Sequence, residues 1–484
     1  MKKSEVQLFP HLNHEVVKDI SGFKLCSYLV ALEGWRRGLE LKWYKDETEL
    51  CKMDRLNSST QGKFFSLSSN EKKHYFFRSR GDIVSNKTVR ICQNKETTKD
   101  FLNEAGVPIP LGTVLSNDKE IIEYAEQVGF PVVVKPLKGS MGKGVYTNIN
   151  NTQELNDVLA ELRSTLKDTE LMIEKYYPGK EYRIYVVGDK VIGATNRVPA
   201  NIDGDGIHSV EDLIKIKNNE RKSNPYLAPK PIKVDFEVRN LLKSVGYDLK
   251  SIPRKDEKVF LRDKSNLSSG GDPIEATDEL SGEVKQIAVD TLKALPSIPH
   301  AGVDIIVDPQ DDRKGVVLEV NATAEIGFHL YPLEGKARDV PSAIIDYYFP
   351  ETKNMNRSSF YFDYLSVIEP LKQWAAEEVK IAAAPERSKS IKYITVTGKL
   401  KKVGYMSYIK RQAMRRGLHG YIQQIDDNSI EIKLLNGNEQ NLNGFIEVCK
   451  KGSKKSKVQN VLENDLQENV EIPQKMGFQI ISIN

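Results

Sequence analysis

Two groups of residues in this chain have the side-chain types and spacing to act on a phosphate. The first is a loop rich in lysine and glycine within the segment VVVKPLKGSMGKGVY, residues 132–146. Glycine lets backbone N–H groups approach an anion closely and lysine adds positive charge, so this composition indicates phosphate binding. The spacing is not that of a P-loop, because the four-residue spacer and the Ser or Thr after the lysine are missing. A hairpin with a flexible basic turn stays open as the alternative. The candidate loop residues are Gly139, Ser140, Met141, Gly142, Lys143 and Gly144.

The second group lies on two strand-like segments, GVDIIV and VVLEVN, which are predicted to form a hairpin that turns at DPQDDRK. Alternation along the first segment places Asp304 on the face opposite its apolar neighbours. Glu319 and Asn321 are two residues apart in the second segment, so they share a face. Two carboxylates and an amide oxygen suit Mg²⁺, which prefers hard oxygen ligands and binds substrate phosphates. The open alternative is that these groups sit on a solvated sheet face.

The two groups complement each other, since phosphoryl transfer needs a cationic clamp and a metal. The sequence shows no Ser/His/Asp or Cys/His signature of a side-chain nucleophile. Arg183 can be interpreted as a charge on an edge strand and His329 as a loop histidine, and we expect neither to be catalytic.

Helices and strands alternate around these groups. In GFKLCSYLVALEGWRRGLELKWY, a stripe of Leu25, Leu29, Leu32 and Trp35 falls at helical spacing, so the segment predicts a helix and then a strand. NKETTKDFLNEAGVPIP and NDKEIIEYAEQVGFP each predict a helix, and the second leads into the strand at 132–135. EYRIYVV and KVIGATNRV predict a hairpin that turns at Gly188-Asp189. From Ile391 the order is strand, helix, strand, strand, helix, strand.

We therefore expect an α+β protein. The expected divisions are an N-terminal region at 1–88, a larger domain at 89–350, a helical linker at 351–388 that ends in the Ala-rich IAAAPERSKS, and a small domain at 389–484.

Composition indicates a soluble, cytoplasmic protein. Of 484 residues, 39% are apolar, and 71 Lys and Arg against 67 Asp and Glu give a net charge of +4, which does not call for nucleic acid. The four cysteines lie far apart, as is typical of reduced thiols. No segment has the length of an apolar membrane span. The basic run KKGSKKSK, residues 450–457, is interpreted as a solvated loop.

From about Ala31 to Pro350 the chain resembles the ATP-grasp family, in the branch of cyanophycin synthetase and the ATP-grasp half of bifunctional glutathione synthetase. The motifs that carry the resemblance include ALEGWRRGL, HYFFRSRGD, NKETTK, VVVKPLKGSMGKGV, IEKYYPGKEYRIYVVGDKVIGATNRVPA, LRDKSNLSSGGDPIEATDE, AGVDI, LEVNATAEIGFHLYP and GKARDVPSAIIDYYFP. They occur in family order.

The resemblance implies a role for each matching residue. Lys95 and Lys135 match the lysines that hold the ATP phosphates, and the loop at 139–144 matches the segment that folds over them. Glu174, Lys175 and Tyr177 match the hinge beside the adenine, but packing within the hinge is the preferred interpretation of Tyr177, because aromatic residues usually serve cores. The remaining matches are Glu181 for the ribose hydroxyls, Arg197 for the transferring phosphate, Asp304, Glu319 and Asn321 for two Mg²⁺ ions, and Arg262, Asn266 and Ser268 for a segment near the substrate.

The implied reaction is an ADP-forming ligation of a carboxylate to an amine through an acyl phosphate, with Lys135 and Arg197 as the catalytic cations. ATP and Mg²⁺ are the implied cofactors, with Mn²⁺ as a substitute metal. Amino acids or peptides are the expected substrates, without nucleic acid or membrane partners, and a homo-oligomer is left open.

The segment from Ile391 to the end resembles acylphosphatase, and its strand and helix order agrees with that fold. Met406 stands where acylphosphatases carry the phosphate-binding arginine, and Gln424 stands in place of the water-orienting asparagine. Methionine has neither charge nor donor, so we predict an inactive domain. It could dock substrate or cap the site, or serve as a packing or dimerisation module.

Two other functions stay open from the sequence. The chain could be an acylphosphatase-type phosphohydrolase if the C-terminal domain is active despite Met406. It could also be a nucleotide-binding regulatory protein without turnover. The intact set of Lys135, Asp304, Glu319 and Asn321 argues against the regulatory alternative.

Overall fold

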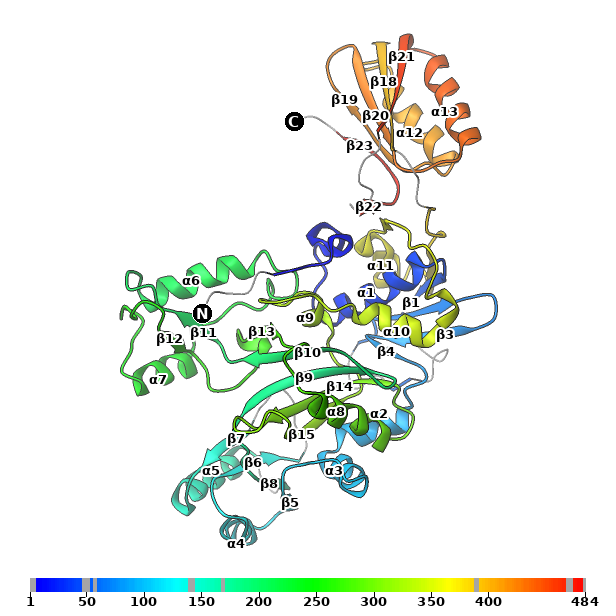
Figure 1. Cartoon of the computed structure of the whole chain (residues 1–484). Coiled ribbons are helices and arrows are strands. Elements are labelled where there is room, and N and C mark those ends of the chain that lie inside the picture. Colours follow the sequence, from blue (N-terminus) through cyan, green and yellow to red (C-terminus); the bar gives the residue numbers. More distant parts are fainter. Residues whose placement is uncertain are drawn as a thin grey trace.

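The computed structural model describes residues 6–45, 53–54, 59–137, 144–166, 170–386, 391–466 and 473–481. It is an α+β structure, as predicted, in which successive sheets follow one another along an elongated molecule (Figure 1). Among the described residues, no helix combines the length and the apolar character that crossing a membrane requires.

The N-terminal sheet is built around one buried helix. Helix α1 (Gly22–Arg36) is buried along most of its length, including the predicted stripe of Leu25, Leu29, Leu32 and Trp35. The strands of this sheet have the order β17-β1-β2-β3-β4. They are β1 (Glu40–Tyr44), β2 (Phe64–Ser68), β3 (Lys73–Phe77), β4 (Arg80–Gly81) and β17 (Glu378–Lys380).

A small antiparallel sheet with the order β5-β8-β6-β7 carries the start of the lysine and glycine loop. Its apolar face packs with α4 and α5 into a core of its own. The elements are α2 (Asn86–Gln93), α3 (Lys95–Glu104), β5 (Gly112–Leu115), α4 (Asp118–Val128), β6 (Val132–Pro136), β7 (Tyr146–Ile149), α5 (Thr152–Thr165) and β8 (Leu171–Lys175).

The sheet that carries the carboxylates has the order β13-β10-β9-β14-β15, with α8 packed on one face. Both predicted hairpins are present, since β9 pairs with β10 and β14 with β15 in antiparallel fashion. The elements are β9 (Lys180–Val187), β10 (Lys190–Val198), β13 (Asp272–Glu275), α8 (Gly282–Ala294), β14 (His300–Val307) and β15 (Gly315–Asn321), followed by α9 (Gly327–Leu330) and α10 (Val340–Tyr348).

An insertion between β10 and β13 forms a lobe with its own apolar core, at the left of Figure 1. It contains β11 (Asn201–Asp203), α6 (Val210–Arg221), α7 (Phe236–Ser244) and β12 (Lys258–Phe260).

The segment expected as a helical linker packs against the N-terminal sheet instead. It contains β16 (Phe360–Tyr361), α11 (Tyr364–Lys372) and β17, and β17 pairs with β1 as an edge strand. Ile368 and Ile381 are buried in the N-terminal core. Because this pairing joins residues more than 330 positions apart, local composition does not reveal it. The expected domain boundaries stay a prediction.

The C-terminal sheet has the order β21-β18-β20-β19-β23 and lies at the end of the molecule opposite the β5–β8 sheet (Figure 1). Its elements are β18 (Ile391–Lys399), α12 (Tyr405–Arg415), β19 (Gly420–Gln424), β20 (Ser429–Leu434), α13 (Glu439–Lys451), β21 (Lys457–Leu466) and β23 (Phe478–Ile481). Strand β22 (Gln474–Lys475) pairs in parallel with β16, and Lys475 forms an ion pair with Asp363 at 2.7 Å. These contacts attach the C-terminal unit to the N-terminal body.

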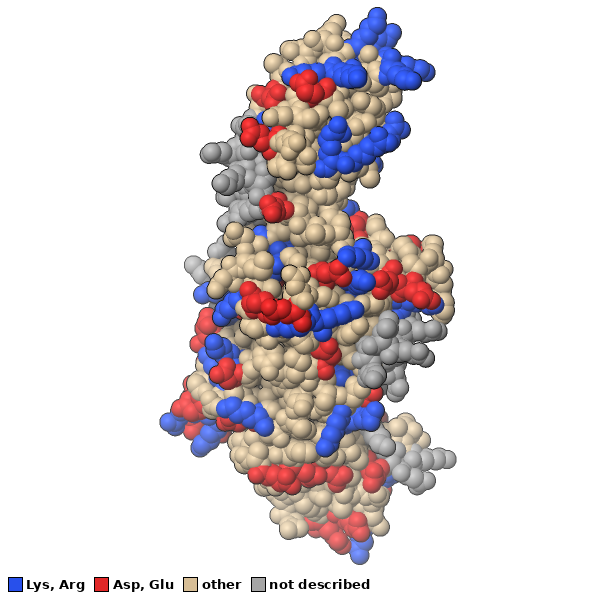
Figure 2. Space-filling view, turned by 90° about the vertical axis from the view of Figure 1, so that its right-hand side faces the viewer, with Lys and Arg blue, Asp and Glu red and all other residues tan. Residues whose placement is uncertain are grey.

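Surface charge is mixed along the molecule. Figure 2 shows acidic and basic side chains interspersed over the body, with basic side chains gathered over the C-terminal domain at the top. Lys451, Lys454, Lys455 and Lys457 are exposed, in line with the interpretation of this run as solvated.

Candidate active site

A buried carboxylate on the small sheet holds two lysines. Glu174, on β8, is 2% exposed and accepts a hydrogen bond of 2.7 Å from Nζ of Lys135, on β6. Lys99, on α3, donates to the other carboxylate oxygen. Burial raises the pKa of Glu174, but the two lysines lower it by more, so the pKa lies below its ordinary value. The Glu174 side chain, expected beside the adenine, is thus an anchor for lysines in this structure.

Lys95 links this sheet to the carboxylate hairpin. It is the first residue of α3, whose N-cap Asn94 accepts hydrogen bonds from the backbone N–H groups of residues 96 and 97. Burial lowers the pKa of Lys95, while Glu319 raises it and Lys135 lowers it. Helix α3, which begins at Lys95, packs against β15, the strand of the predicted metal ligand Glu319, and its Lys99 binds Glu174 beside Lys135.

The loop that should cover the phosphates lies mostly outside the described residues. This applies to Gly139, Ser140, Met141, Gly142 and Lys143. Gly144 is described, and its φ of +68° is in the region that favours glycine.

Asp304 lies at the centre of a buried charge cluster on the larger sheet. It is 2% exposed, so the alternative of a solvated sheet face is wrong for this residue. Arg183 Nη2 and Arg197 Nη2 each donate to Asp304 Oδ2 at 2.8 Å, and Arg183 Nε donates to Oδ1. Burial raises the pKa of Asp304, but Arg183 and Arg197 lower it more, so the carboxylate stays ionised.

Arg183 is not on an edge strand, contrary to one sequence interpretation. Strand β9 lies between β10 and β14, and Arg183 pairs in register with Asp304 and with Thr195. Strand order follows from long-range pairing, which the segment EYRIYVV does not encode. The sequence did contain one sign that Arg183 belongs to the site: Glu181 and Arg183 are two residues apart on a strand and therefore share a face.

Glu181 and Arg197 form an ion pair with each other. The Nε atom of Arg197 is buried and has no hydrogen-bond partner among the described residues. A buried donor without a partner is costly, so this atom is a ready donor for a ligand oxygen.

Lys99 is another residue that the sequence analysis missed, although its i,i+4 spacing from Lys95 places both on one helix face.

The predicted metal ligands come together on β14 and β15. Asp304 and Glu319 are directly paired across the strands, and Asn321 Nδ2 donates to Glu319 Oε1 at 3.0 Å. The Glu319 side chain is 42% exposed, and the Asn321 amide oxygen is a further hard donor. No three His, Cys, Asp or Glu side chains gather as a metal site within the described ranges, so the candidate set is two carboxylates and an amide. This donor set fits a divalent cation that keeps several waters.

The hinge after β8 is tied to the loop that follows α4. Lys175 Nζ donates to the carbonyl oxygens of Gly129 and Phe130 at 2.8 and 3.0 Å. Tyr177, two residues further, is half-buried. Lys175 thus stabilises the hinge through backbone contacts.

Arg262, Asn266 and Ser268 lie at the edge of the insertion. Arg262 forms ion pairs with Asp235 and Glu237 at the start of α7. Asn266 caps a 3-10 turn by accepting from the backbone N–H of Ser268 at 2.9 Å. Its other hydrogen bonds go to the carbonyl oxygens of Ser269 and Lys233, so the contacts of Arg262 lie within the insertion and do not connect it to Asp304 or Lys135.

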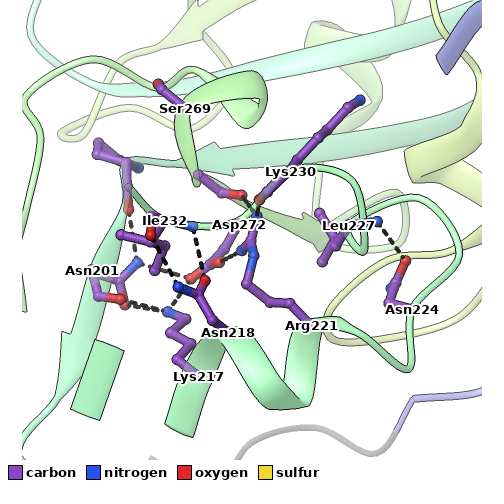
Figure 3. A network of polar contacts seen from close by, with 12 residues as sticks. Asn201, Lys217, Asn218, Arg221, Asn224, Leu227, Lys230, Ile232, Ser269 and Asp272 are labelled. Atoms are coloured by element: carbon purple, nitrogen blue, oxygen red, sulfur yellow. Dashed lines mark hydrogen bonds and ion pairs between the residues drawn. The ribbon is translucent and has the colours of Figure 1, made fainter. Parts of the chain in front are cut away.

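A buried polar network joins the insertion to the larger sheet. Asp272, on β13, accepts hydrogen bonds from Lys217 at 2.5 Å, Arg221 at 2.7 Å and Asn201 at 2.9 Å (Figure 3). Each of these side chains is buried. The network therefore fixes α6 against the sheet that carries Asp304.

The C-terminal residues at the acylphosphatase positions make local contacts. Met406, in the first turn of α12, packs against the core of its own domain. Gln424 Nε2 donates to the carbonyl oxygens of Asp426 and Ser429. The inactivity of this domain stays a prediction.

Comparison with known proteins agrees with this two-part architecture. Residues 92–208 match a RimK-like ATP-grasp domain, and residues 392–480 match acylphosphatase. The chain thus combines a RimK-like ATP-grasp domain with a C-terminal acylphosphatase domain.

Its homologues include cyanophycin synthetases and bifunctional glutathione biosynthesis proteins. It is 33% identical to cyanophycin synthetase of Geminocystis herdmanii over 55% of this chain and 32% of that protein. It is 30% identical to a glutathione biosynthesis bifunctional protein of Clostridium perfringens over 67% and 41% of the two chains. A crystal structure of a bifunctional glutathione synthetase from Pasteurella multocida is 30% identical, with a TM-score of 0.48, over 61% of this chain and 41% of that one. The chain spans about a third to two fifths of these relatives.

Proposed function

We propose that the protein is an ATP-dependent, ADP-forming ligase that joins a carboxylate to an amine through an acyl phosphate. One observation carries the proposal: helix α3 packs against β15, the strand of Glu319, while its Lys99 binds Glu174 beside Lys135 on the small sheet. A triphosphate between the two sheets would meet lysines from one side and the carboxylate hairpin from the other. The homology to ATP-grasp ligases supports this proposal.

In the proposed mechanism, Lys95 and Lys135 hold the phosphates, and the loop at 139–144 covers them. Glu174 keeps the Lys135 ammonium oriented through their 2.7 Å hydrogen bond. Arg197 would place its unpartnered Nε on the transferring phosphate, where it stabilises developing charge. Glu181, now paired with Arg197, would accept from the ribose hydroxyls.

The metal would be held by Asp304, Glu319 and Asn321. We propose Mg²⁺, with two ions bound and Mn²⁺ as a substitute. A divalent cation supplies charge neutralisation for the phosphates. Asp304 has to share its oxygens with Arg183 and Arg197, because both guanidinium groups already donate to it.

The substrate carboxylate would then attack the γ-phosphorus, and ADP would leave. The amine would next displace phosphate from the acyl phosphate, so no covalent enzyme intermediate is needed. We propose amino acids or peptides as substrates. Arg262, Asn266 and Ser268 are proposed to shape the substrate end from the insertion lobe.

The test is a screen of amino-acid and dipeptide pairs for ADP release, with mass spectrometry of the products. The proposal expects ADP release only when a carboxylate and an amine are both present, and a product mass equal to the sum of the two minus water. ADP or phosphate release that does not depend on the amine would contradict it and favour a phosphohydrolase.

A further inference from the structure

The loop after the metal-ligand strand carries a carboxylate that the mechanism above does not use. Glu325 follows Asn321 by four residues. Its Oε2 accepts a hydrogen bond of 2.7 Å from the Tyr226 hydroxyl and one of 3.1 Å from Lys230 Nζ. The Lys230 ammonium also lies 3.4 Å from the centre of the Tyr226 ring. Both partners come from the insertion lobe, so Glu325 lies where the lobe meets the larger sheet.

One oxygen of Glu325 is left over. Within the described residues, Oε1 makes no hydrogen bond, and the side chain is 22% exposed. Two donors already face Oε2. A carboxylate oxygen at a partly open position is an acceptor for a cationic donor.

Lys230 points out of the buried network that fixes the insertion. In Figure 3 it extends away from Asp272, Lys217 and Arg221, while those three side chains converge. The Lys230 side chain thus leaves the Asp272 network to reach Glu325, while the Lys230 carbonyl oxygen accepts a hydrogen bond of 3.1 Å from Arg221 Nη2.

The loop that carries Glu325 packs closely at two glycines. A Cβ on Gly302 would lie 2.8 Å from both Ala324 Cβ and Arg183 Cδ, so Ala324 packs against the strand that carries Asp304 where residue 302 is glycine. A Cβ on Gly327 would lie 2.7 Å from Tyr226 Cδ2. The loop around Glu325 therefore packs against β14 on one side and against Tyr226 of the insertion on the other.

Electrostatics agree with this placement. Burial raises the pKa of the Tyr226 hydroxyl, Glu325 raises it further, and Arg183 lowers it. The Tyr226 hydroxyl, which donates to Glu325, is therefore also influenced by the charge of the guanidinium that holds Asp304.

The N-terminal region also contacts the loop that carries Glu325. Ser79 Oγ donates to the Ala324 carbonyl oxygen at 2.7 Å, and the Ile326 N–H points to Cys26 Sγ at 3.4 Å. Such support fixes the position of Glu325 between its two neighbours.

We propose that Glu325 binds the ammonium group of the amine substrate and accepts its proton; this inference rests on the proposed ligase function. One ammonium proton passes to Glu325 Oε1, and the neutral nitrogen attacks the carbonyl carbon of the acyl phosphate. The C–N bond forms, and the C–O bond to phosphate breaks. Phosphate leaves with the bonding electron pair and the second proton of the nitrogen, and Glu325 returns its proton to solvent.

The test compares Glu325→Gln with the wild type, using the carboxylate and amine that the ADP screen identifies. Glutamine can still accept from Tyr226 and Lys230 but carries no charge. We expect the KM for the amine to rise at least about tenfold, as the loss of a charge-assisted hydrogen bond predicts. The KM for ATP and for the carboxylate should stay within about twofold of the wild type.

Hydroxylamine separates a role in amine binding from a structural role. It is neutral near pH 7.5 and traps acyl phosphates without ammonium recognition. We expect Glu325→Gln to retain hydroxylamine-dependent ADP release while it loses activity with the amine. Equal loss with both nucleophiles, or an unchanged KM for the amine, would overturn the proposal. Glu283→Gln, at an exposed position in the first turn of α8, is the matched control and should change neither reaction.

A binding measurement keeps this inference separate from the ligase assay. Saturation-transfer NMR with L-alanine methyl ester and L-lysine methyl ester reports binding of an ammonium without a free carboxylate. A signal in the wild type that Glu325→Gln abolishes supports the proposal, and a signal of equal size in both proteins overturns it. If the wild type releases no ADP with any substrate pair, the proposed function fails, whereas the NMR result still decides the ammonium site.

Discussion

Asp304 and Glu319 face each other as a directly paired couple across β14 and β15, and Arg183 contacts both. Its Nη2 lies 2.8 Å from Asp304 Oδ2 and 3.7 Å from Glu319 Oε1. One carboxylate is buried and neutralised by arginine, and the other is partly exposed. This asymmetry makes Glu319 the more accessible of the two proposed metal ligands, whereas the charge of Asp304 is balanced by its arginine partners.

Removing Arg183 should destabilise the fold. Arg183→Met leaves Asp304 buried with Arg197 as its remaining cation, and breaking a buried pair costs about 3–5 kcal/mol. Urea unfolding followed by circular dichroism measures the change in unfolding free energy. The exposed Arg313→Met, whose partner Asp311 is at the surface, should change it by less than about 1 kcal/mol. A similar small effect for Arg183→Met would contradict the role assigned to this pair.

Removing the phosphate clamp should weaken nucleotide binding itself. Lys135→Ala removes an ammonium that Glu174 orients, and we expect the Kd for ATP to rise at least about tenfold because a charge-assisted contact is lost. Calorimetric titration measures the affinity. Lys119→Ala on α4, whose side chain is 83% exposed, is the matched control. An ATP affinity equal to that of the wild type would remove Lys135 from the proposed site.

The free energy of unfolding should depend on the ionisation of Asp304 at acidic pH. Because its folded-state pKa lies below the ordinary value of 3.8, Asp304 contributes stability above that pH and loses it as pH falls through the folded-state pKa. The unfolding free energy of the wild type should therefore decrease from about pH 4 downward. Asp304→Asn should show a smaller decrease over the same range. Parallel curves for the two proteins would show that Asp304 does not titrate as predicted.

The C-terminal domain should not hydrolyse acyl phosphates. The full-length Asp304→Asn variant, in which the proposed function expects ligase turnover to be suppressed, should release phosphate from benzoyl phosphate at the uncatalysed rate. The reason is that Met406 offers no cation to the phosphate. Hydrolysis well above the buffer blank, and lost on mutation of Gln424 to Ala, would show an active acylphosphatase.

Elements defined by local patterns were predicted well from the sequence. Alternation along GVDIIV and VVLEVN identified the hairpin and the face of Asp304, and the α1 stripe was visible in its leucines. These features depend on residues close together in the chain. The RimK-like and acylphosphatase matches agree with the motifs that carried the resemblance.

Features that depend on distant pairing were not predicted. Arg183 was interpreted as an edge-strand charge because the order β10-β9-β14 is set by β14, more than 110 residues later. The same holds for β17, which joins the N-terminal sheet across the whole ATP-grasp segment. The pairing of Lys99 with Glu174 likewise depends on how α3 packs against another sheet. The assigned roles of the individual site residues stay predictions.

The central claim is that the lysines of the small sheet and the carboxylates of the larger sheet act on one triphosphate. A double-mutant cycle of Lys135→Met and Glu319→Gln, measured by ATP affinity in the presence of Mg²⁺, tests it most directly. If both residues act on the same bound nucleotide, the two effects should be coupled by about 0.5–3 kcal/mol. If the effects add to within about 0.3 kcal/mol, the two residues act independently, and the claim is contradicted.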